Sequence, residues 1–258
     1  MLQIVKEPSK MHQPAILIEH LTKNYEDVTA LEDLSLQINN GELFGLLGPN
    51  GAGKTTTINI LCGLTKPTSG TAKVDRFDVQ KETWKVRELI GVCPQETAVY
   101  PYLTGAENVE LFANLHSMTK ENIKTRRNML FEKLGLEQEA KRKAEKYSGG
   151  MKRRLSLTLA LIHNPQIAFL DEPTVAMDPQ SRHAVWDFIR ELKKENKTII
   201  LTTHYMEEAE ALCDRVGIID HGKLLALGSP KDLILKAGVT NLEEVFINLT
   251  GRKIREEI

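Results

Sequence analysis

A glycine-rich segment near residue 50 carries the strongest chemical signal in the sequence. Residues 48–55 read Gly-Pro-Asn-Gly-Ala-Gly-Lys-Thr and fit the pattern G-x-x-x-x-G-K-[ST]. The glycines let backbone N–H groups turn inward around a chain of phosphates, and the following helix adds the positive end of its dipole. We expect Lys54 to reach the β- and γ-phosphates of a nucleotide and Thr55 to ligate Mg²⁺. The nucleotide-contacting residues predicted in this segment are Gly48, Pro49, Asn50, Gly51, Ala52, Gly53, Lys54, Thr55 and Thr56.

Two adjacent carboxylates form a second candidate group. Asp171 and Glu172 follow the apolar run at residues 167–170, where a buried strand is expected to end. Asp171 suits a group that orders Mg²⁺ or its waters, and Glu172 suits a base that polarises an attacking water. Taken alone, the pair could simply cap a strand. Next to the phosphate-binding loop (residues 48–55), it predicts a P-loop nucleotide hydrolase.

Further short segments narrow the class of hydrolase. Ser148-Gly149-Gly150 is expected to open a helix and so offers a second anion site. Gln95 and His204 each follow an apolar strand, and Asp178 with Pro179 predicts another helix start. Each feature is weak on its own, because a lone glutamine carries no information and a lone histidine is more often a capping residue.

In their order along the chain, these segments resemble the motifs of ABC (ATP-binding cassette) ATPases. Residues 147–151, Tyr-Ser-Gly-Gly-Met, resemble the family signature L-S-G-G-Q but differ at both ends. Gln95 resembles the Q-loop glutamine, residues 175–178 resemble the D-loop, and His204 resembles the switch histidine. Tyr25 stands where the family places an aromatic ring that stacks on adenine. The resemblance runs across nearly the whole chain.

The resemblance implies a mechanism and partners. Two such subunits pair head to tail and hold ATP between the phosphate-binding loop of one and the signature of the other. The implied partners are a second copy or a second ABC ATPase, and a separate transmembrane permease, with no nucleic acid. The two anion sites of this chain agree with such sharing, because one triphosphate does not need both in one subunit. The implied catalytic residues are Glu172, His204, Gln95 and Lys54; the implied Mg²⁺ ligands are Thr55, Gln95 and Asp171; and the implied ATP contacts beyond the loop are Tyr25, Ser148, Gly149, Gly150 and Asp178.

The elements that position these residues are expected to alternate between short buried strands and helices. That order predicts an α/β fold with a mostly parallel sheet, whose ligands bind at the carboxyl ends of the strands. We expect a P-loop NTPase core with an N-terminal antiparallel β subdomain and a helical insert subdomain at about residues 100–160. The expected limits are one ABC ATPase domain at 15–235 and a short helical tail at 236–258. Asn40-Gly41 predicts a hairpin turn.

Composition agrees with a protein that does not cross a membrane. The chain of 258 residues has 41% hydrophobic residues and a net charge of -1, so no global field draws it to nucleic acid. Its apolar runs are far shorter than the ~20 residues that a membrane helix needs. Residues 1–14 are polar and read as a frayed leader, and the three cysteines read as buried thiols. We expect a cytoplasmic protein that lies on the cytoplasmic face of the cell membrane through its permease.

The end of the sequence points to a subfamily. Residues 241–246, Asn-Leu-Glu-Glu-Val-Phe, resemble the tail of daunorubicin-resistance-type exporter ATPases, and the variants Tyr147 and Met151 fit that group. Such systems export drugs, natural products or lipids through a separate permease. A plain amphipathic helix packed on the core is the alternative for this tail. A non-transport ABC ATPase acting on ribosomes or DNA, and a module that binds ATP without hydrolysing it, are the alternative functions.

Two basic clusters have less specific explanations. Lys141-Arg142-Lys143 lies among glutamates, which favours a solvated helix face over a nucleic-acid patch. Residues 152–154, Lys-Arg-Arg, follow the signature directly. They either add positive field near the nucleotide or serve surface solubility, and the sequence leaves both open.

Overall fold

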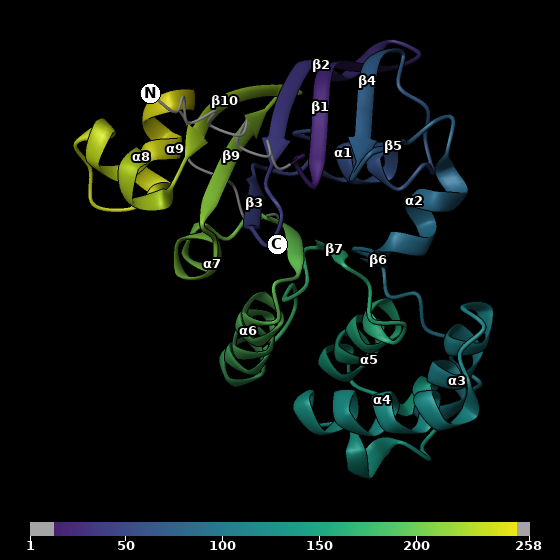
Figure 1. Ribbon diagram of the computed structural model, residues 1–258. Helices are drawn as coiled ribbons and strands as arrows, with labels where there is room; N and C mark the ends of the chain where they lie inside the picture. Colours follow the sequence, from purple (N-terminus) through teal and green to yellow (C-terminus); the bar gives the residue numbers. More distant parts are fainter. Residues whose placement is uncertain (1–12, 252–258) are drawn as a thin grey trace, which may run out of the picture.

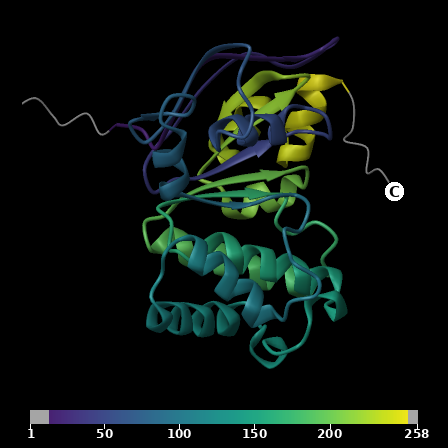
Figure 2. The ribbon, with the colours of Figure 1, turned by 90° about the vertical axis from the view of Figure 1, so that its right-hand side faces the viewer.

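The computed structural model describes residues 13–251, which form two sheets with helices between and below them (Figures 1 and 2). The first sheet has four antiparallel strands in the order β2-β1-β4-β5. Its bounds are β1 Ile16–Tyr25, β2 Val28–Ile38, β4 Ser69–Val74 and β5 Phe77–Asp78. This is the predicted N-terminal antiparallel subdomain.

The second sheet has six strands in the order β10-β9-β3-β8-β7-β6, and all neighbours are parallel except β10 and β9. Its bounds are β3 Leu43–Leu47, β6 Ile90–Cys93, β7 Ile167–Asp171, β8 Thr198–Thr203, β9 Arg215–Asp220 and β10 Lys223–Gly228. Every residue of β3, β7 and β8 is buried. That burial explains their unbroken apolar sequences, because helices or strands cover both faces of a parallel sheet.

Two buried clusters lie on opposite faces of the six-stranded sheet. Phe44 and Leu46 of β3 belong to the cluster shared with α1 (Lys54–Leu61) and the antiparallel sheet. Leu43 and Leu47 point the other way, as successive residues of a strand do. Their cluster includes the helices α5 (Gly149–Leu161), α6 (Pro179–Lys194), α7 (Met206–Leu212) and α9 (Leu242–Thr250).

A helical region projects below the six-stranded sheet, shown in teal in Figure 1. It contains α3 (Gly105–Leu115), α4 (Lys120–Lys133) and two short 3₁₀ turns, Glu137–Glu139 and Ala144–Lys146. A capping box starts α3, since Glu107 N–H donates to Thr104 Oγ1 and the Glu107 carboxylate accepts from Thr104 N–H. The domain limits given above remain predictions.

The hairpin predicted at Asn40-Gly41 is wrong. β2 and β3, which flank this turn, lie in different sheets: β2 pairs with β1, whereas β3 pairs with β8 and β9. Both edges of β3 are therefore taken by parallel neighbours, and the turn carries the chain from one sheet to the other. Gly41 still serves the turn through its φ of 71°.

Some elements were not predicted from the sequence, and parts of both predicted termini lie outside the described residues. The helices α2 (Thr83–Leu89) and α7 and the strands β4 and β5 had no clear sequence signal. Two helices end the described chain, α8 (Pro230–Ala237) and α9, and α9 lies within the predicted helical tail. α9 packs Leu242, Val245 and Phe246 into the core. Most of the expected leader, residues 1–12, and the end of the tail, 252–258, lie outside the described residues. Between residues 13 and 251, no helix is long and apolar enough to span a membrane.

Candidate active site

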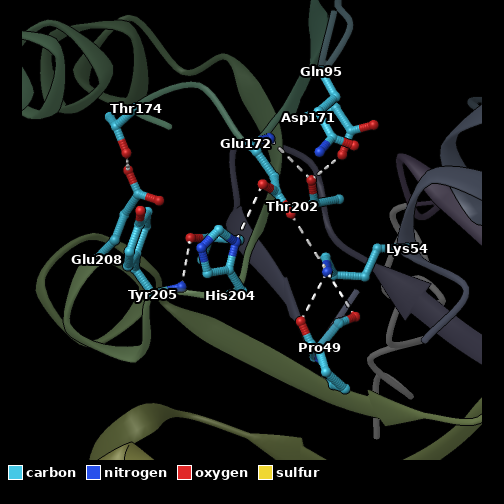
Figure 3. A network of polar contacts seen from close by, with 12 residues as sticks. Pro49, Lys54, Gln95, Asp171, Glu172, Thr174, Thr202, His204, Tyr205 and Glu208 are labelled. Atoms are coloured by element: carbon cyan, nitrogen blue, oxygen red, sulfur yellow. Dashed lines mark hydrogen bonds and ion pairs between the residues drawn. The ribbon is translucent and has the colours of Figure 1, made fainter. Parts of the chain in front are cut away.

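The phosphate-binding loop connects the carboxyl end of β3 to the start of α1. Gly53 has a φ of 107°, and a Cβ added there would meet Ala30 O at 2.6 Å. A Cβ on Gly48 would meet Ile219 O at 2.2 Å. Both positions therefore require glycine, as the sequence pattern implies. Lys54 is buried, and its Nζ donates hydrogen bonds to Gly48 O (2.8 Å) and Pro49 O (3.0 Å), as Figure 3 shows for Pro49.

Asp171 joins three segments that are distant in sequence. It is the last residue of β7, and its Oδ2 accepts a hydrogen bond from Thr55 Oγ1 at 2.9 Å. Its Oδ1 accepts one from Thr202 Oγ1 of β8 (Figure 3). The phosphate-binding loop, β7 and β8 therefore meet at this carboxylate, at the carboxyl edge of the sheet.

Glu172 lies between a lysine and a histidine. Its Oε1 is 3.5 Å from Lys54 Nζ and its Oε2 is 3.2 Å from His204 Nδ1 (Figure 3). Its backbone N–H donates to Thr202 O at 3.0 Å and to Thr202 Oγ1 at 3.1 Å. The chain adopts a left-handed conformation here, with a φ of 50°. The residue thus has restraints on both its backbone and its carboxylate.

Burial and charge act against each other at this cluster. Burial alone would raise the pKa of Glu172, but the contacts with His204 and Lys54 outweigh it and lower the pKa. Burial lowers the pKa of Lys54, and the charges of Glu172 and Asp171 act in the opposite direction. Glu172 is therefore ionised at neutral pH and able to accept a proton.

A pocket with a volume of about 410 Å³ lies at the phosphate-binding loop, and Tyr25 and Gln95 both line it. Tyr25 leaves 43% of its surface exposed, and Lys23 Nζ lies 4.6 Å from its ring centre. The pocket is lined by Tyr25, Val28, Ala30, Asn50, Gly51, Ala52, Gly53, Lys54, Thr55, Thr56, Gln95 and Glu172. A larger pocket of about 720 Å³ borders His204 on another side, but its glutamates disfavour phosphate.

The remaining predicted contacts do not line the phosphate-binding pocket within the described chain. The Ser148 hydroxyl accepts from Met151 N–H at 3.2 Å and caps α5. Gly149 faces open space, because an added Cβ would meet no atom within 4 Å. Asp178 caps α6 by accepting from Ser181 N–H at 2.9 Å. One chain therefore does not bring the segment 148–150 (the signature segment) to its own phosphate-binding loop.

Two residues of this region were missed by sequence reasoning. Thr202 hydrogen-bonds to the Asp171 carboxylate and to the Glu172 N–H. Nothing in the sequence of this apolar strand sets Thr202 apart from the neighbouring threonine as a residue of the site. Arg153 is 2% exposed and hydrogen-bonds to backbone around Gln95 and Asp171, so the surface explanation of residues 152–154 is wrong for this side chain. The position of Arg153 on the helix could have indicated its burial. Leu157 and Ala160, four and seven positions later on the same face of α5, are also buried.

The comparisons with known proteins agree with this geometry. The profile of the ABC transporter family matches residues 31–175, more than half of the chain. The chain belongs to the ABC transporter family. As an ABC ATPase domain it binds and hydrolyses ATP. The family match and the solved relatives thus confirm both the predicted fold class and the predicted ATPase activity.

Its relatives include resistance proteins. The linearmycin resistance ATP-binding protein LnrL of Bacillus subtilis is 43% identical over 238 residues, covering 92% of this chain and 75% of the relative. The doxorubicin resistance ATP-binding protein DrrA of Mycobacterium tuberculosis is 43% identical over 233 residues, covering 90% and 70%. These matches confirm the predicted resemblance to drug-resistance ABC ATPases.

A solved ABC cassette has the same fold. The dimeric, post-hydrolysis ATP-binding cassette MJ0796, bound to ADP and Pi, superimposes with a TM-score of 0.77 at 29% identity. The match covers 83% of this chain and 98% of that cassette. The solved relative is therefore a dimer holding the products of ATP hydrolysis.

Proposed function

We propose that this ABC ATPase powers the export of a drug, natural product or lipid through a separate membrane permease. The observation that carries the ATPase part is the position of Glu172, between Lys54 and His204 at the phosphate-binding loop. The export part is supported by the likeness to LnrL and DrrA, which are resistance ATP-binding proteins. The non-transport alternative has no such support.

ATP binding rests on three groups of this chain. Tyr25, half exposed at the edge of the pocket, stacks on the adenine ring. The backbone N–H groups of the phosphate-binding loop and the start of α1 bind the phosphate oxygens. Lys54 Nζ, which lies among the carbonyls of this loop, binds the β- and γ-phosphates.

The residues beside the loop fit Mg²⁺. Thr55, Asp171 and Gln95 offer a hydroxyl, a carboxylate and an amide oxygen, and Mg²⁺ prefers such oxygen ligands. Thr55 Oγ1 and Asp171 Oδ2 already lie 2.9 Å apart. When bound, the ion neutralises charge on the phosphate oxygens.

Glu172 is the proposed general base. Its ionised carboxylate accepts a proton from the water that attacks the γ-phosphorus in line with the departing ADP oxygen. His204 holds the Glu172 carboxylate from one side and contacts the γ-phosphate. Gln95, which lines the pocket, helps to orient the water and the ion.

The complete site is proposed to form between two ATPase subunits. The signature segment opens α5, where the first N–H groups of a helix have no intrahelical partner, yet it does not line the pocket of its own chain. A head-to-tail pair brings the signature segment of one subunit to the phosphate-binding loop of the other, and Asp178 couples the two sites. The pair is a homodimer or includes a second ABC ATPase. The dimeric form of the solved relative supports this arrangement.

An exposed apolar surface next to the Q-loop is the proposed docking site for the permease. Tyr100 and Tyr102 lie in the loop after Gln95, and Leu111 and Leu115 lie on α3. Tyr102 leaves 76% of its surface exposed and Leu115 leaves 73%. Docking there holds the ATPase at the cytoplasmic face of the membrane.

The export proposal is tested by recovering the partners of this chain. The full-length tagged chain is purified from detergent-solubilised membranes of its native host, and the partners are identified by mass spectrometry. A stoichiometric, strongly apolar subunit is the expected result. Recovery of only soluble partners, ribosomes or DNA-bound proteins contradicts export and leaves the ATPase chemistry intact.

A further inference from the structure

Arg153 makes an unusual set of contacts for a buried arginine. It lies on the first turns of α5 and is 2% exposed. Its Nε donates to Pro173 O at 3.2 Å, and its Nη1 donates to Gln95 O at 2.9 Å. Nη1 also donates to Pro94 O, and Nη2 donates to Asp171 O. The guanidinium thus binds four backbone carbonyl groups.

The four carbonyls come from two segments of the active site. Pro94 and Gln95 begin the loop after β6, whereas Asp171 and Pro173 stand on either side of Glu172. A guanidinium is a planar fork with fixed N–H directions, so bonding to both segments at once sets their separation. A lysine has a single ammonium group and cannot span all four acceptors in the same way.

The backbone of Glu172 needs such a restraint. Its φ of 50° is a left-handed conformation that costs energy for a residue with a side chain. Its N–H is held by the carbonyl of Thr202 on β8. In addition, Arg153 donates hydrogen bonds to the carbonyl groups of the two neighbouring residues, Asp171 and Pro173. These restraints aim the Glu172 carboxylate at Lys54 and His204.

We propose that Arg153 is a positioning residue of the ATPase site, which holds Glu172 and Gln95 in register with each other and with helix α5. The inference rests on the roles proposed above for those two residues. Because α5 begins at the signature segment, a shift of that segment is passed through Arg153 to the base of the same subunit. In a head-to-tail dimer, the state of one ATP site therefore influences the other.

The test compares Arg153→Gln with a matched control in the full-length chain. Arg153→Gln should lower kcat for ATP hydrolysis by about 10²-fold, the effect of a small misplacement of catalytic groups. The dissociation constant for ATP should change by less than about threefold, because Arg153 does not line the pocket. Arg153→Lys should restore part of kcat. Parent-like kcat in a folded Arg153→Gln protein overturns the proposal.

The control is Arg126→Gln. Arg126 also donates to two carbonyls, Leu161 O (2.8 Å) and Ile162 O (3.0 Å), but at the opposite end of α5. It should lower the stability to urea while leaving kcat unchanged. An equal loss of kcat in both variants assigns Arg153 a merely structural role and overturns the proposal. If Arg153→Gln does not fold, the kcat of Arg153→Lys must still fall below that of the control.

A double variant separates this proposal from the assignment of the base. If Arg153 acts through Glu172, adding Arg153→Gln to Glu172→Gln should not lower the residual turnover further. If Arg153→Gln lowers the turnover of the Glu172→Gln protein as much as it lowers that of the parent protein, the positioning role is overturned. If Glu172→Gln alone hydrolyses ATP at the parent rate, Glu172 is not the base. That result is obtained without any Arg153 variant, so it tests the assignment of the base separately.

Discussion

Replacing Lys54 with alanine should weaken ATP binding with little effect on the fold. The side chain is 5% exposed, and its Nζ lies among the carbonyls of Gly48 and Pro49 and 3.5 Å from Glu172. A hydrogen bond from a charged donor contributes about 1.5–3 kcal/mol. Losing one such bond to the phosphates corresponds to binding about 10- to 150-fold weaker.

The assay is a titration of the purified full-length chain with a fluorescent ATP analogue, with urea unfolding measured in parallel. Lys197→Ala is the matched control, because Lys197 is also buried and donates to a backbone carbonyl, Asn164 O at 3.3 Å. It lies outside the phosphate-binding pocket and should leave ATP affinity unchanged. Unchanged affinity in a folded Lys54→Ala protein refutes the reading of this loop.

Three further predictions concern the supports of the site and its partners. Thr202→Val removes the hydroxyl that binds Asp171 and the Glu172 N–H. It should lower the free energy of unfolding, measured by urea denaturation, by about 1–3 kcal/mol. An unchanged midpoint of the urea unfolding curve contradicts this. Gly149→Asp adds a negative charge to the signature segment, and should abolish hydrolysis while ATP affinity stays at the parent value, whereas parent turnover argues against a shared site. Tyr102→Glu should keep ATPase activity but lose the apolar partner in the affinity purification, while Leu235→Glu, equally exposed on α8, should retain it.

The centre of the candidate active site could be predicted from the sequence because the chemistry expected of it is local. Between residues 48 and 55, close backbone approaches require glycine at Gly48 and Gly53, and the proposed binding of phosphate and Mg²⁺ calls for a lysine and a threonine. The strands that end at Asp171 and just before His204 are short apolar runs, since both faces of the sheet are covered. Alternation of such runs with helices was enough to predict that their carboxyl ends meet.

Contacts between distant segments could not be predicted in the same way. Asn40-Gly41 has the local sequence of a hairpin, but the pairing partners of β3 are decided by β8 and β9, more than a hundred residues later. Arg153 sits in a basic run typical of a surface, and only the tertiary fold surrounds it with carbonyl groups. The ends of the predicted domains have no chemical marker and remain predictions.

The central claim is that Glu172 is the base for ATP hydrolysis, and the Glu172→Gln variant tests it most directly. The change keeps the shape of the side chain and removes the carboxylate that lies 3.2 Å from His204 and 3.5 Å from Lys54. ATP affinity and steady-state hydrolysis are measured on the same preparation of the full-length chain. The account predicts retained binding and a loss of turnover of about 10²- to 10⁴-fold, as for other general bases. Hydrolysis at the parent rate would contradict it.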